Sequence, residues 1–314
     1  MRKNRLFIVS HLFVFCIGLS LCKGEKTFEV LDGCYVPLFK TTSGLNLSYE
    51  AGAHGTNCYD LITVLLPGTF VNVHEFGEKI TEVVWHVNDK KTYKGLMHNE
   101  FLQNFCKEVP EDDVKWLPKP MPLREIRETF QWCSDKENNV PYCWGGCCFG
   151  AVPLPGDYTF SQVFSEDEKE GKNGKTCIKR PYELRGFDCS GWLHFISGGL
   201  LEHSTRRLRE YDGGKVLWKI GKNETVSFED LKKKLPELKL QDTDYIVIIG
   251  HVVVWHDGGL LEFRGKDYGC VYTKGEEAVA KRLMELIARS RERPEEDSDV
   301  RFIRWHPELF KDEK

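Results

Sequence analysis

The stretch LRGFDCSGWLHFISGG, residues 184–199, places a single cysteine, Cys189, between an acid and a hydroxyl. Cysteine attacks a carbonyl carbon as a thiolate, and the first turn of a helix favours that negative charge through its N–H groups and its dipole. Trp192, Phe195 and Ile196 follow at the spacing of one buried helical face. The pattern predicts a nucleophile at the start of a helix, although a disulfide-bonded cysteine can begin a helix in the same way.

A cysteine nucleophile needs a histidine within hydrogen-bonding reach and a group that orients that histidine. His251 interrupts an apolar run, YIVIIGHVVVW, just after a glycine. An imidazole in a strand that is covered on both faces requires a polar partner. His251 is therefore the predicted base, and a core histidine satisfied by structural hydrogen bonds is the alternative. His194, five residues after Cys189, lies on another helix face and is expected to be a surface or packing residue.

The hairpin that follows His251 offers the orienting group. If Asp257 and Gly258 form a two-residue turn, Glu262 lies on the same face as His251, roughly 7 Å away at Cβ. A three-residue turn would place Glu262 on the opposite face. With the shorter turn, Glu262 holds the imidazole tautomer as the third member of a triad does. The alternative is a solvent-exposed strand glutamate.

The rest of the sequence predicts the domains that must position these residues. From Thr27 to about Leu102 the chain consists of short β runs punctuated by Gly, Pro, Asn and Asp, which favours a small barrel over residues 25–106. Residues 107–122 are Pro-rich and acidic, as expected of a linker. A second domain then covers residues 123–314, with a polar, turn-rich surface insertion at about 149–180.

Within the second domain, several elements can be predicted by their periodicity and their end signals. LREIRETFQWC, from Leu123, has helical spacing, and Ser227 with Asp230 resembles a capping box before a second helix. YIVIIGHVVVW is expected to form one buried strand, and LLEF the strand that returns from the DGG turn. Residues 276–291 read as an amphipathic helix and VRFIRW as a closing strand.

The first 24 residues run from a cationic start into an apolar stretch and then into small residues. This is the pattern of a secretory signal peptide that is removed on maturation. A retained membrane anchor would need about 18 uninterrupted apolar residues, and Ser10 and His11 interrupt this stretch. Cys22 is an alternative site for a lipid anchor after cleavage, although Leu21 before it is large. No membrane span is predicted in the mature chain.

The composition excludes several classes of function. The chain has 314 residues, of which 41% are hydrophobic, and a net charge of -4. It is long enough to bury a hydrophobic core without stabilisation by disulfides or metals, and its charge creates no field that would attract nucleic acid. The composition therefore indicates a globular protein whose partners are not polyanions.

Export changes how the cysteines are interpreted, because oxidising compartments permit disulfides. Of the twelve cysteines, Cys16 and Cys22 fall in or at the edge of the signal. If Cys189 is kept free for chemistry, an odd number remains, so at least one further thiol is unpaired or pairs with another chain. The pairing stays open. Three cysteines cluster at positions 143, 147 and 148. No second Cys or His pair lies at the spacing of a zinc finger, so no metal site is predicted.

Three blocks occur together in this order: NVPYCWGG (139–146), GFDCSGWLHFI (186–196) and GHVVVWHDGGLLEF (250–263). They resemble the signature blocks of the NlpC-like cell-wall cysteine peptidases over residues 123–310. LITVLLPGTFVNVHEF with YKGLM is similar to the bacterial SH3-like domain that often precedes such domains. The resemblance implies an α+β fold, in which a papain-like domain packs a cysteine-bearing helix on an antiparallel sheet that carries the histidine.

The resemblance also implies roles for individual residues. Cys189 matches the nucleophile and His251 the general base, and Glu262 matches the third polar position, which varies within the family. Three further positions match residues that line the substrate pocket in such enzymes, namely Tyr142, Asp188 and Ser190. The implied substrates are peptidoglycan peptides, cleaved between γ-D-glutamate and a diamino acid such as diaminopimelate, and no cofactor is needed.

Two departures from the family pattern stand out, of which the first affects the length of substrate that fits and the second affects the turn before the histidine strand more than the chemistry. The connection between Gly146 and Cys189 is much longer than usual and contains Cys147, Cys148 and Cys177, so it could cover or narrow the cleft. The usual Pro-Gly-Asp before the histidine strand is replaced by LQDTDYIVI.

The sequence predicts an exported cysteine peptidase of the periplasm or cell envelope that hydrolyses peptidoglycan stem peptides. Two alternatives are a non-catalytic wall-binding protein with a decayed peptidase domain, and an amidase or acyl-transferring enzyme of the same fold. The exact bond, the length of the stem peptide and the oligomeric state stay open.

Overall fold

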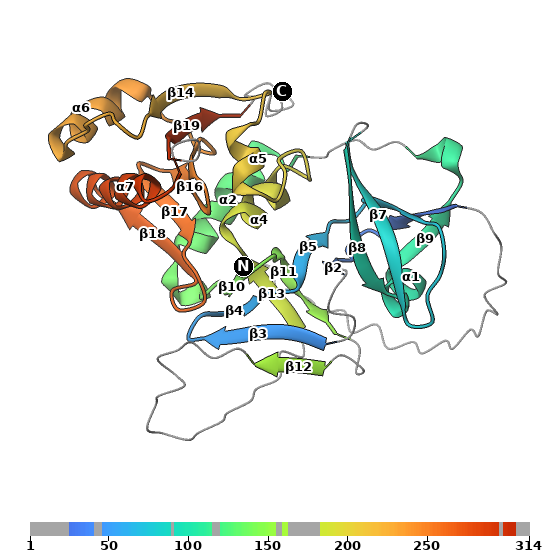
Figure 1. Cartoon of the computed structure of the whole chain (residues 1–314). Helices are drawn as coiled ribbons and strands as arrows, with labels where there is room; N and C mark the ends of the chain where they lie inside the picture. The colour runs from blue at the N-terminus through green and yellow to red at the C-terminus, as the bar shows by residue number, and fades with distance from the viewer. Residues whose placement is uncertain are drawn as a thin grey trace, which may run out of the picture.

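A computed structural model describes most of the chain outside its two ends and one internal stretch. The described residues are 25–40, 46–88, 91–114, 120–154, 159–162, 183–294 and 298–305. The predicted signal peptide, Cys22 and most of the predicted insertion, including Cys177, lie outside the described residues. The fold is a mixed α+β structure with three sheets, so the predicted α+β class is confirmed (Figure 1).

The first sheet has seven strands, with every pairing antiparallel, in the order β5-β2-β8-β7-β6-β1-β9. It lies to the right in Figure 1. The short helix α1 (Asn99–Phe105) connects β8 to β9 along the chain. The strands are β1 (Lys26–Val30), β2 (Val36–Phe39), β5 (Leu61–Leu65), β6 (Phe70–Val73), β7 (Ile80–Asn88), β8 (Lys91–His98) and β9 (Cys106–Val109).

The second sheet combines segments that are far apart in the sequence. Its order is β11-β13-β10-β4-β3-β12, and β4 pairs in parallel with β10 while β3 pairs in parallel with β12. Residues 46–58 therefore leave the β run predicted to form one barrel and join strands from beyond residue 140. The strands are β3 (Asn46–Gly52), β4 (Gly55–Cys58), β10 (Tyr142–Cys143), β11 (Cys147–Pro153), β12 (Thr159–Gln162) and β13 (Glu183–Phe187).

The boundaries of the two domains and the linker, and the SH3-like barrel, stay predictions. The beginning of the predicted linker is structured, because β9 extends to Val109 and pairs with β1, and the 3-10 turn η1 (Glu111–Asp113) follows. Within the described residues, no helix is long and apolar enough to cross a membrane.

The third sheet is fully antiparallel in the order β14-β19-β15-β16-β17-β18. Helices α6 (Phe228–Leu238) and α7 (Glu276–Arg291) pack on one face, and α2 (Leu123–Ser134) and α4 (Cys189–Ile196) on the other. The short elements η2 (Lys136–Asn138) and α5 (Thr205–Arg209) complete this part. The strands are β14 (Lys215–Ile220), β15 (Tyr245–Ile248), β16 (His251–His256), β17 (Gly259–Phe263), β18 (Cys270–Lys274) and β19 (Val300–Arg304).

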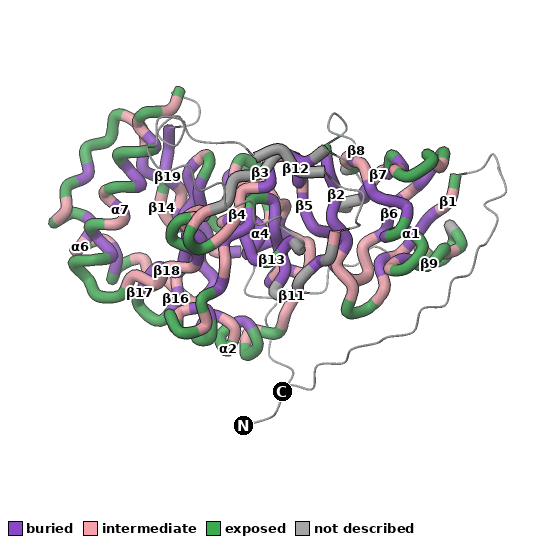
Figure 2. The backbone as a smooth tube through the Cα atoms, turned by 90° about the horizontal axis from the view of Figure 1, so that it is seen from below, coloured by how far each residue is buried: buried purple, intermediate pink, exposed green. Residues whose placement is uncertain are grey.

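Coverage by helices on both faces explains why β15, β16 and β17 are apolar along almost their whole length. Val253 and Leu260 join the core under α6 and α7, whereas Val252 and Leu261 join the core under α2 and α4. In Figure 2 the central strands are mainly buried, and the outer side of α6 is exposed. The helices predicted from Leu123 and over 276–291 are confirmed, as is the capping box of Ser227 and Asp230.

One predicted element is wrong. YIVIIGHVVVW does not form one strand: β15 ends at Ile248, the chain turns at Ile249 and Gly250, and β16 begins at His251. The turn uses a left-handed backbone at Gly250, with φ +82°, which glycine adopts without a steric cost. Both strands are buried on both sides, so the apolar run continued through the turn and concealed it.

Candidate active site

Cys189 is the first residue of α4, and Asp188 is its N-cap. Asp188 Oδ1 accepts hydrogen bonds from the backbone N–H groups of Ser190, at 2.9 Å, and Gly191, at 2.7 Å. The sequence folds this way because an N-cap carboxylate satisfies N–H groups that the first helical turn leaves without partners. Cys189 is therefore held at the positive end of a helix dipole, as the sequence predicts.

The helix places its buried face against the third sheet. Trp192 is 1% exposed, and its ring lies 5.4 Å from the ring of Phe263 on β17 and 5.5 Å from that of Phe130 on α2. The antiparallel sheet that carries the histidine is thus packed against the helix that carries the cysteine. Phe187, just before the N-cap, packs edge-on against Trp192 and fixes the direction in which the chain enters the helix.

His251 begins β16, and its partner is the glutamate proposed from the hairpin. Asp257 and Gly258 form the two-residue turn, with φ of 41° and 74°, and His256 pairs with Gly259. That register brings Glu262 to the face of His251, where His251 Nε2 lies 2.7 Å from Glu262 Oε2. The imidazole therefore donates through Nε2, and no partner of Nδ1 is found among the residues that the structure describes.

Glu262 is buried, with its side chain 0% exposed, and a second cation balances its charge. Arg282 on α7 donates to Oε1 through Nε at 2.8 Å and to Oε2 through Nη2 at 2.9 Å. Burial alone would raise the pKa of the Glu262 carboxyl, but hydrogen bonds from His251 and Arg282 outweigh it and lower the pKa to about 2. Glu262 is consequently a permanent carboxylate at neutral pH.

A cavity of about 480 Å³ brings the two reactive side chains together. Cys189 and His251 both line it, and so do Tyr142, Asp188 and Ser190. Glu262 is not part of the lining and lies behind His251. Of the six residues predicted from the sequence, five therefore line one cavity. The sixth, Glu262, is buried and contacts His251.

The electrostatics around Cys189 favour a neutral thiol in the resting state. Burial, and after it the charge of Asp188, raise the pKa of the thiol to about 12. The backbone N–H groups of Val252 and Ser190 and the charge of Arg289 act in the opposite direction. Because Val252 directly follows His251, this contact places the sulfur against the start of the histidine strand. For Cys189 to act as a nucleophile, a base would have to remove the thiol proton.

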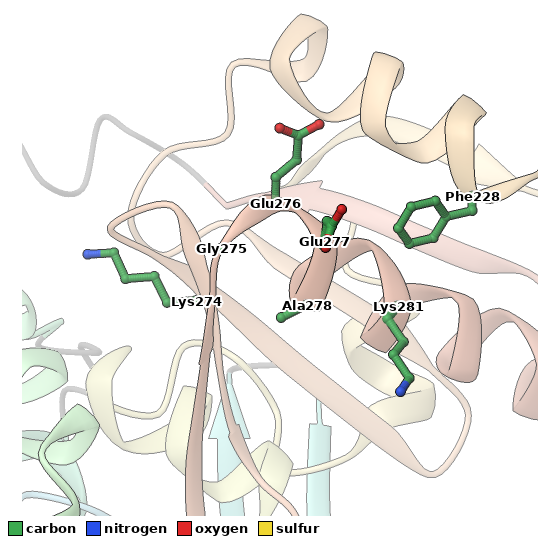
Figure 3. A pocket seen from close by; sticks show the side chains of 7 residues that line it. All are labelled: Phe228, Lys274, Gly275, Glu276, Glu277, Ala278 and Lys281. Atoms are coloured by element: carbon green, nitrogen blue, oxygen red, sulfur yellow. The ribbon is translucent and has the colours of Figure 1, made fainter.

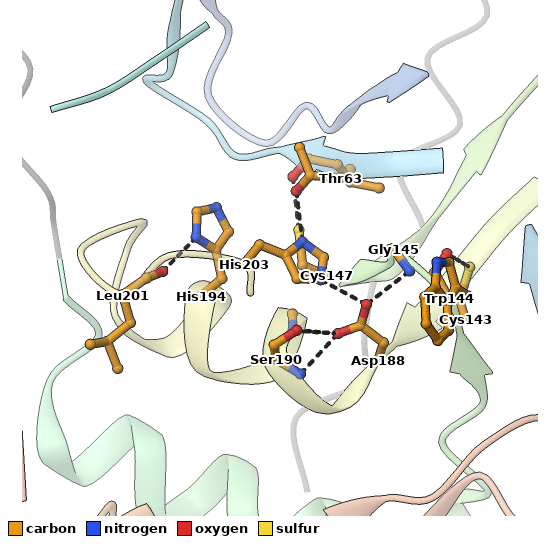
Figure 4. A network of polar contacts seen from close by, with 12 residues as sticks. Thr63, Cys143, Trp144, Gly145, Cys147, Asp188, Ser190, His194, Leu201 and His203 are labelled. Carbon is orange, nitrogen blue, oxygen red and sulfur yellow. Dashed lines mark hydrogen bonds and ion pairs between the residues drawn. The ribbon is translucent and has the colours of Figure 1, made fainter. Parts of the chain in front are cut away.

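Asp188 is the centre of a network that the sequence did not predict (Figure 4). Its Oδ2 accepts from the backbone N–H of Gly145 at 2.9 Å and lies 2.8 Å from His203 Nε2, and His203 Nδ1 lies 2.8 Å from the hydroxyl of Thr63 on β5. Burial would raise the pKa of the Asp188 carboxyl, but His203 and the backbone donors lower it below its usual range. Both oxygens are used by the protein, so Asp188 acts here as a positioning residue.

Several residues of this site were not predicted from the sequence. His203 and Thr63 carry no local pattern, since they come from segments 140 residues apart, and Arg282 looked like one more polar residue of an amphipathic helix. Trp144, by contrast, lies in the NVPYCWGG block and lines the cavity, 47% exposed. Its position next to Tyr142 in that block was a usable signal. His194 is buried and bonds to the Leu201 carbonyl, which is the packing role expected.

A larger cavity of about 680 Å³ lies at the start of α7, away from this chemistry (Figure 3). Its lining combines Phe228 with Lys274 at the end of β18 and with lysine and glutamate side chains at the start of α7, and it contains none of the six predicted site residues. Among the described residues, no cluster of His, Cys, Asp and Glu is arranged to hold a metal ion. The nine cysteines that the structure describes are free thiols.

Comparisons with solved structures find NlpC/P60 proteins. An NlpC/P60 family protein from Bacillus cereus shares 13% identity at a TM-score of 0.26, covering 82% of this chain and 61% of that protein. NlpC2 from Trichomonas vaginalis shares 10% identity at a TM-score of 0.22, over 79% of this chain and 67% of that one. NlpC1 from the same organism shares 9% at a TM-score of 0.27, over 81% and 89%.

These neighbours bear the family name that the three sequence blocks suggest, but similarity this low does not place the chain in that family. This chain spans 61% of the length of the Bacillus cereus protein. No protein-family model matches the chain, and no curated protein matches it. The candidate site is therefore defined by its own geometry.

Proposed function

We propose that the protein is a cysteine peptidase that hydrolyses peptide stems of peptidoglycan, at the bond between γ-D-glutamate and a diamino acid. One observation carries the proposal: Cys189, at the start of α4, and His251, bonded to a buried Glu262, line the same cavity. The three sequence blocks that contain these residues support the choice of substrate. No metal or organic cofactor takes part in the proposed reaction.

In the proposed mechanism, His251 Nδ1 takes the proton of the Cys189 thiol as the sulfur attacks the scissile carbonyl carbon. Glu262 holds the imidazole in the required tautomer and stabilises its positive charge. The imidazolium then gives the proton to the leaving amine, which releases the first product. Water, deprotonated by the same imidazole, hydrolyses the thioester and restores the free thiol.

The oxyanion of the tetrahedral intermediate requires a hydrogen-bond donor near the sulfur. The N–H groups of Ser190 and Gly191 are already bonded to Asp188. The N–H of Cys189 itself has no acceptor among the described residues. We therefore assign the oxyanion to this N–H group, which points along the dipole of α4.

The proposal extends to the location of the enzyme. We propose that the chain is exported through the signal predicted in residues 1–24 and acts in the periplasm or the cell envelope. A lipid anchor at Cys22 would keep it at a membrane surface. Its partners would be peptidoglycan peptides, and nucleic acid would not be among them.

The test is mass spectrometry of defined muropeptides incubated with the mature chain under reducing conditions. We expect loss of the bond between γ-D-glutamate and diaminopimelate with the wild type, and no cleavage with Cys189→Ala or His251→Ala. Binding of the muropeptides without cleavage by folded wild type would favour the non-catalytic wall-binding alternative. Cleavage of a different amide bond that still requires Cys189 would favour the amidase alternative, and cleavage by Cys189→Ala would exclude the nucleophile.

A further inference from the structure

The charges around the catalytic cavity are unequal, although the whole chain is slightly acidic. Three permanently cationic side chains line the cavity, namely Lys40, Arg264 and Arg289. Asp188 is the one acidic residue in the lining. Its two oxygens are bonded to His203 and to N–H groups of the protein, and its single negative charge offsets only one of the three cations. The lining of the cavity therefore carries a net positive charge.

The three cations differ in what they contact. Arg264 Nη2 lies 3.5 Å from Glu285 Oε2, and its guanidinium stacks 5.2 Å from the ring centre of Tyr268. Lys40 donates to the carbonyl of Tyr59. Arg289 is exposed, and across the described residues its guanidinium has neither a hydrogen bond nor an ion pair. Arg289 is thus the cation at this cavity that is free to bind a ligand.

Arg289 is also well placed relative to the reactive groups. It lies in the last turns of α7, and its Nη2 would be 3.9 Å from a Cβ atom built on Gly250, the residue before His251. Its positive charge lowers the pKa of the Cys189 thiol, against the larger effects of burial and Asp188. Arg289 and Cys189 line the same cavity, so a substrate whose scissile carbonyl lies over Cys189 would come close to this guanidinium. Its planar fork of N–H groups matches the two oxygens of a carboxylate.

We propose that Arg289 binds a carboxylate of the substrate next to the scissile bond and so selects anionic peptides. This inference rests on the proposed function for the reaction itself, but the anion-binding property of Arg289 is independent of it. Arg289 is a specificity-determining residue in this proposal. It takes no part in proton transfer.

A first experiment tests the anion site without any peptidase activity. Iodoacetate and iodoacetamide alkylate the same sulfur and differ in charge, so the ratio of their rates at Cys189, followed by mass spectrometry, reports on local positive charge. We expect Arg289→Gln to lower the ratio of iodoacetate to iodoacetamide about two- to fivefold, as for an exposed ion pair. Lys281→Gln, which removes one charge from α7 at the other cavity, should leave the ratio unchanged.

A second experiment uses stem peptides that differ only in γ-D-glutamate against D-isoglutamine, which replaces the carboxylate by a carboxamide. We expect wild type to cleave the carboxylate form about tenfold faster or more in kcat/KM, and Arg289→Gln to lose this preference. Arg289→Lys should keep part of it. A preference that persists in Arg289→Gln, or its absence in wild type, would overturn the proposal for the substrate.

The two experiments separate the two proposals. If neither peptide is cleaved but the alkylation ratio depends on Arg289, the proposed function fails and the anion site stands. If the peptides are cleaved but the alkylation ratio is the same in wild type, Arg289→Gln and Lys281→Gln, the function stands and the role of Arg289 is wrong. Raising the salt concentration should weaken the effect of Arg289, because exposed charges are screened.

Discussion

Glu262 shows how a single buried charge can serve both the fold and the chemistry. Its carboxylate is enclosed, and it is stable there because His251 and Arg282 supply three hydrogen bonds. A buried carboxylate without such partners would be costly. The same bonds decide which imidazole nitrogen carries the proton, so Nδ1 of His251 is left available for the proposed role as base.

Replacing Glu262 by glutamine should separate these roles from simple packing. The amide has nearly the same shape but cannot balance Arg282 or an imidazolium, so we expect kcat/KM to fall about 10²-fold or more, with little change in KM. Leaving the Arg282 guanidinium without its carboxylate should also lower the free energy of unfolding by about 3 kcal/mol. The matched control is Glu285→Gln, since Glu285 bonds to the same arginine but is exposed. Equal rates for the two variants would contradict the assignment.

The depressed pKa of Glu262 predicts a specific acid sensitivity. Its folded-state pKa of about 2 lies below the ordinary value of 4.5, so the carboxylate stabilises the folded state above pH 4.5. That contribution, roughly 3 kcal/mol, is lost as the pH falls from 4.5 towards 2. Urea unfolding at several pH values should show a steeper loss of stability in this window for wild type than for Glu262→Gln. Parallel curves would show that Glu262 is not the group responsible.

At the scale of elements, the position of Cys189 depends on how closely α4 approaches the loop before β11. A Cβ atom on Gly191 would clash with the carbonyl oxygen of Gly146 and lie 2.8 Å from His203 Nε2. Gly191, two residues after Cys189, is thus a condition for close packing. The N–H of Asp188 also bonds to the Gly146 carbonyl, at 3.0 Å, which ties the helix start to this loop.

Gly191→Ala should therefore move the start of α4 and with it the thiol. We expect a loss of about 1–3 kcal/mol in the free energy of unfolding, as for overpacking in a core, and a fall in the rate of Cys189 alkylation or cleavage. Gly221→Ala is the matched control, because a Cβ there meets no atom within 4 Å. If both variants unfold at the same denaturant concentration, the close approach of α4 is not a constraint.

Some of these elements could be predicted because their signals are local. Asp257 and Gly258 fix a two-residue turn, and the register of the hairpin follows from it, so the face of Glu262 was predictable. The turn at Gly250 was concealed because apolar residues on both sides left one glycine as its only sign. His203 could not be found at all, since its role depends on Thr63 and Asp188, which other segments supply.

At the scale of the molecule, the site is assembled from both halves of the chain. β4, from residues 55–58, pairs with β10, which carries Tyr142, and Thr63 of the first sheet bonds to His203 beside α4. The hydroxyl of Tyr93 on β8 donates to Glu202 at 2.7 Å. Contacts between segments so distant in sequence leave no periodic pattern, which is why the N-terminal region was expected to form a barrel by itself.

These contacts predict that residues 120–314 will not behave as an independent unit. A fragment that starts at residue 120 lacks β3 and β4, so β10 and β12 lose the strands between them and expose unpaired edges. It also lacks Thr63, so His203 loses one of its two hydrogen-bond partners. We expect the fragment to unfold at a lower temperature and less cooperatively than the full chain, and to bind hydrophobic dyes.

The comparison should be made by calorimetry, with the full chain and the variant Thr63→Val measured beside the fragment. Thr63→Val removes one hydroxyl and keeps every strand, so we expect it to unfold cooperatively with a loss of about 1 kcal/mol. A fragment with the melting temperature and cooperativity of the full chain would show that residues 25–106 are dispensable for the fold of residues 120–314. In that case the pairing of β4 with β10 would contribute little, and the predicted domain boundary near residues 107–122 would be the physical one.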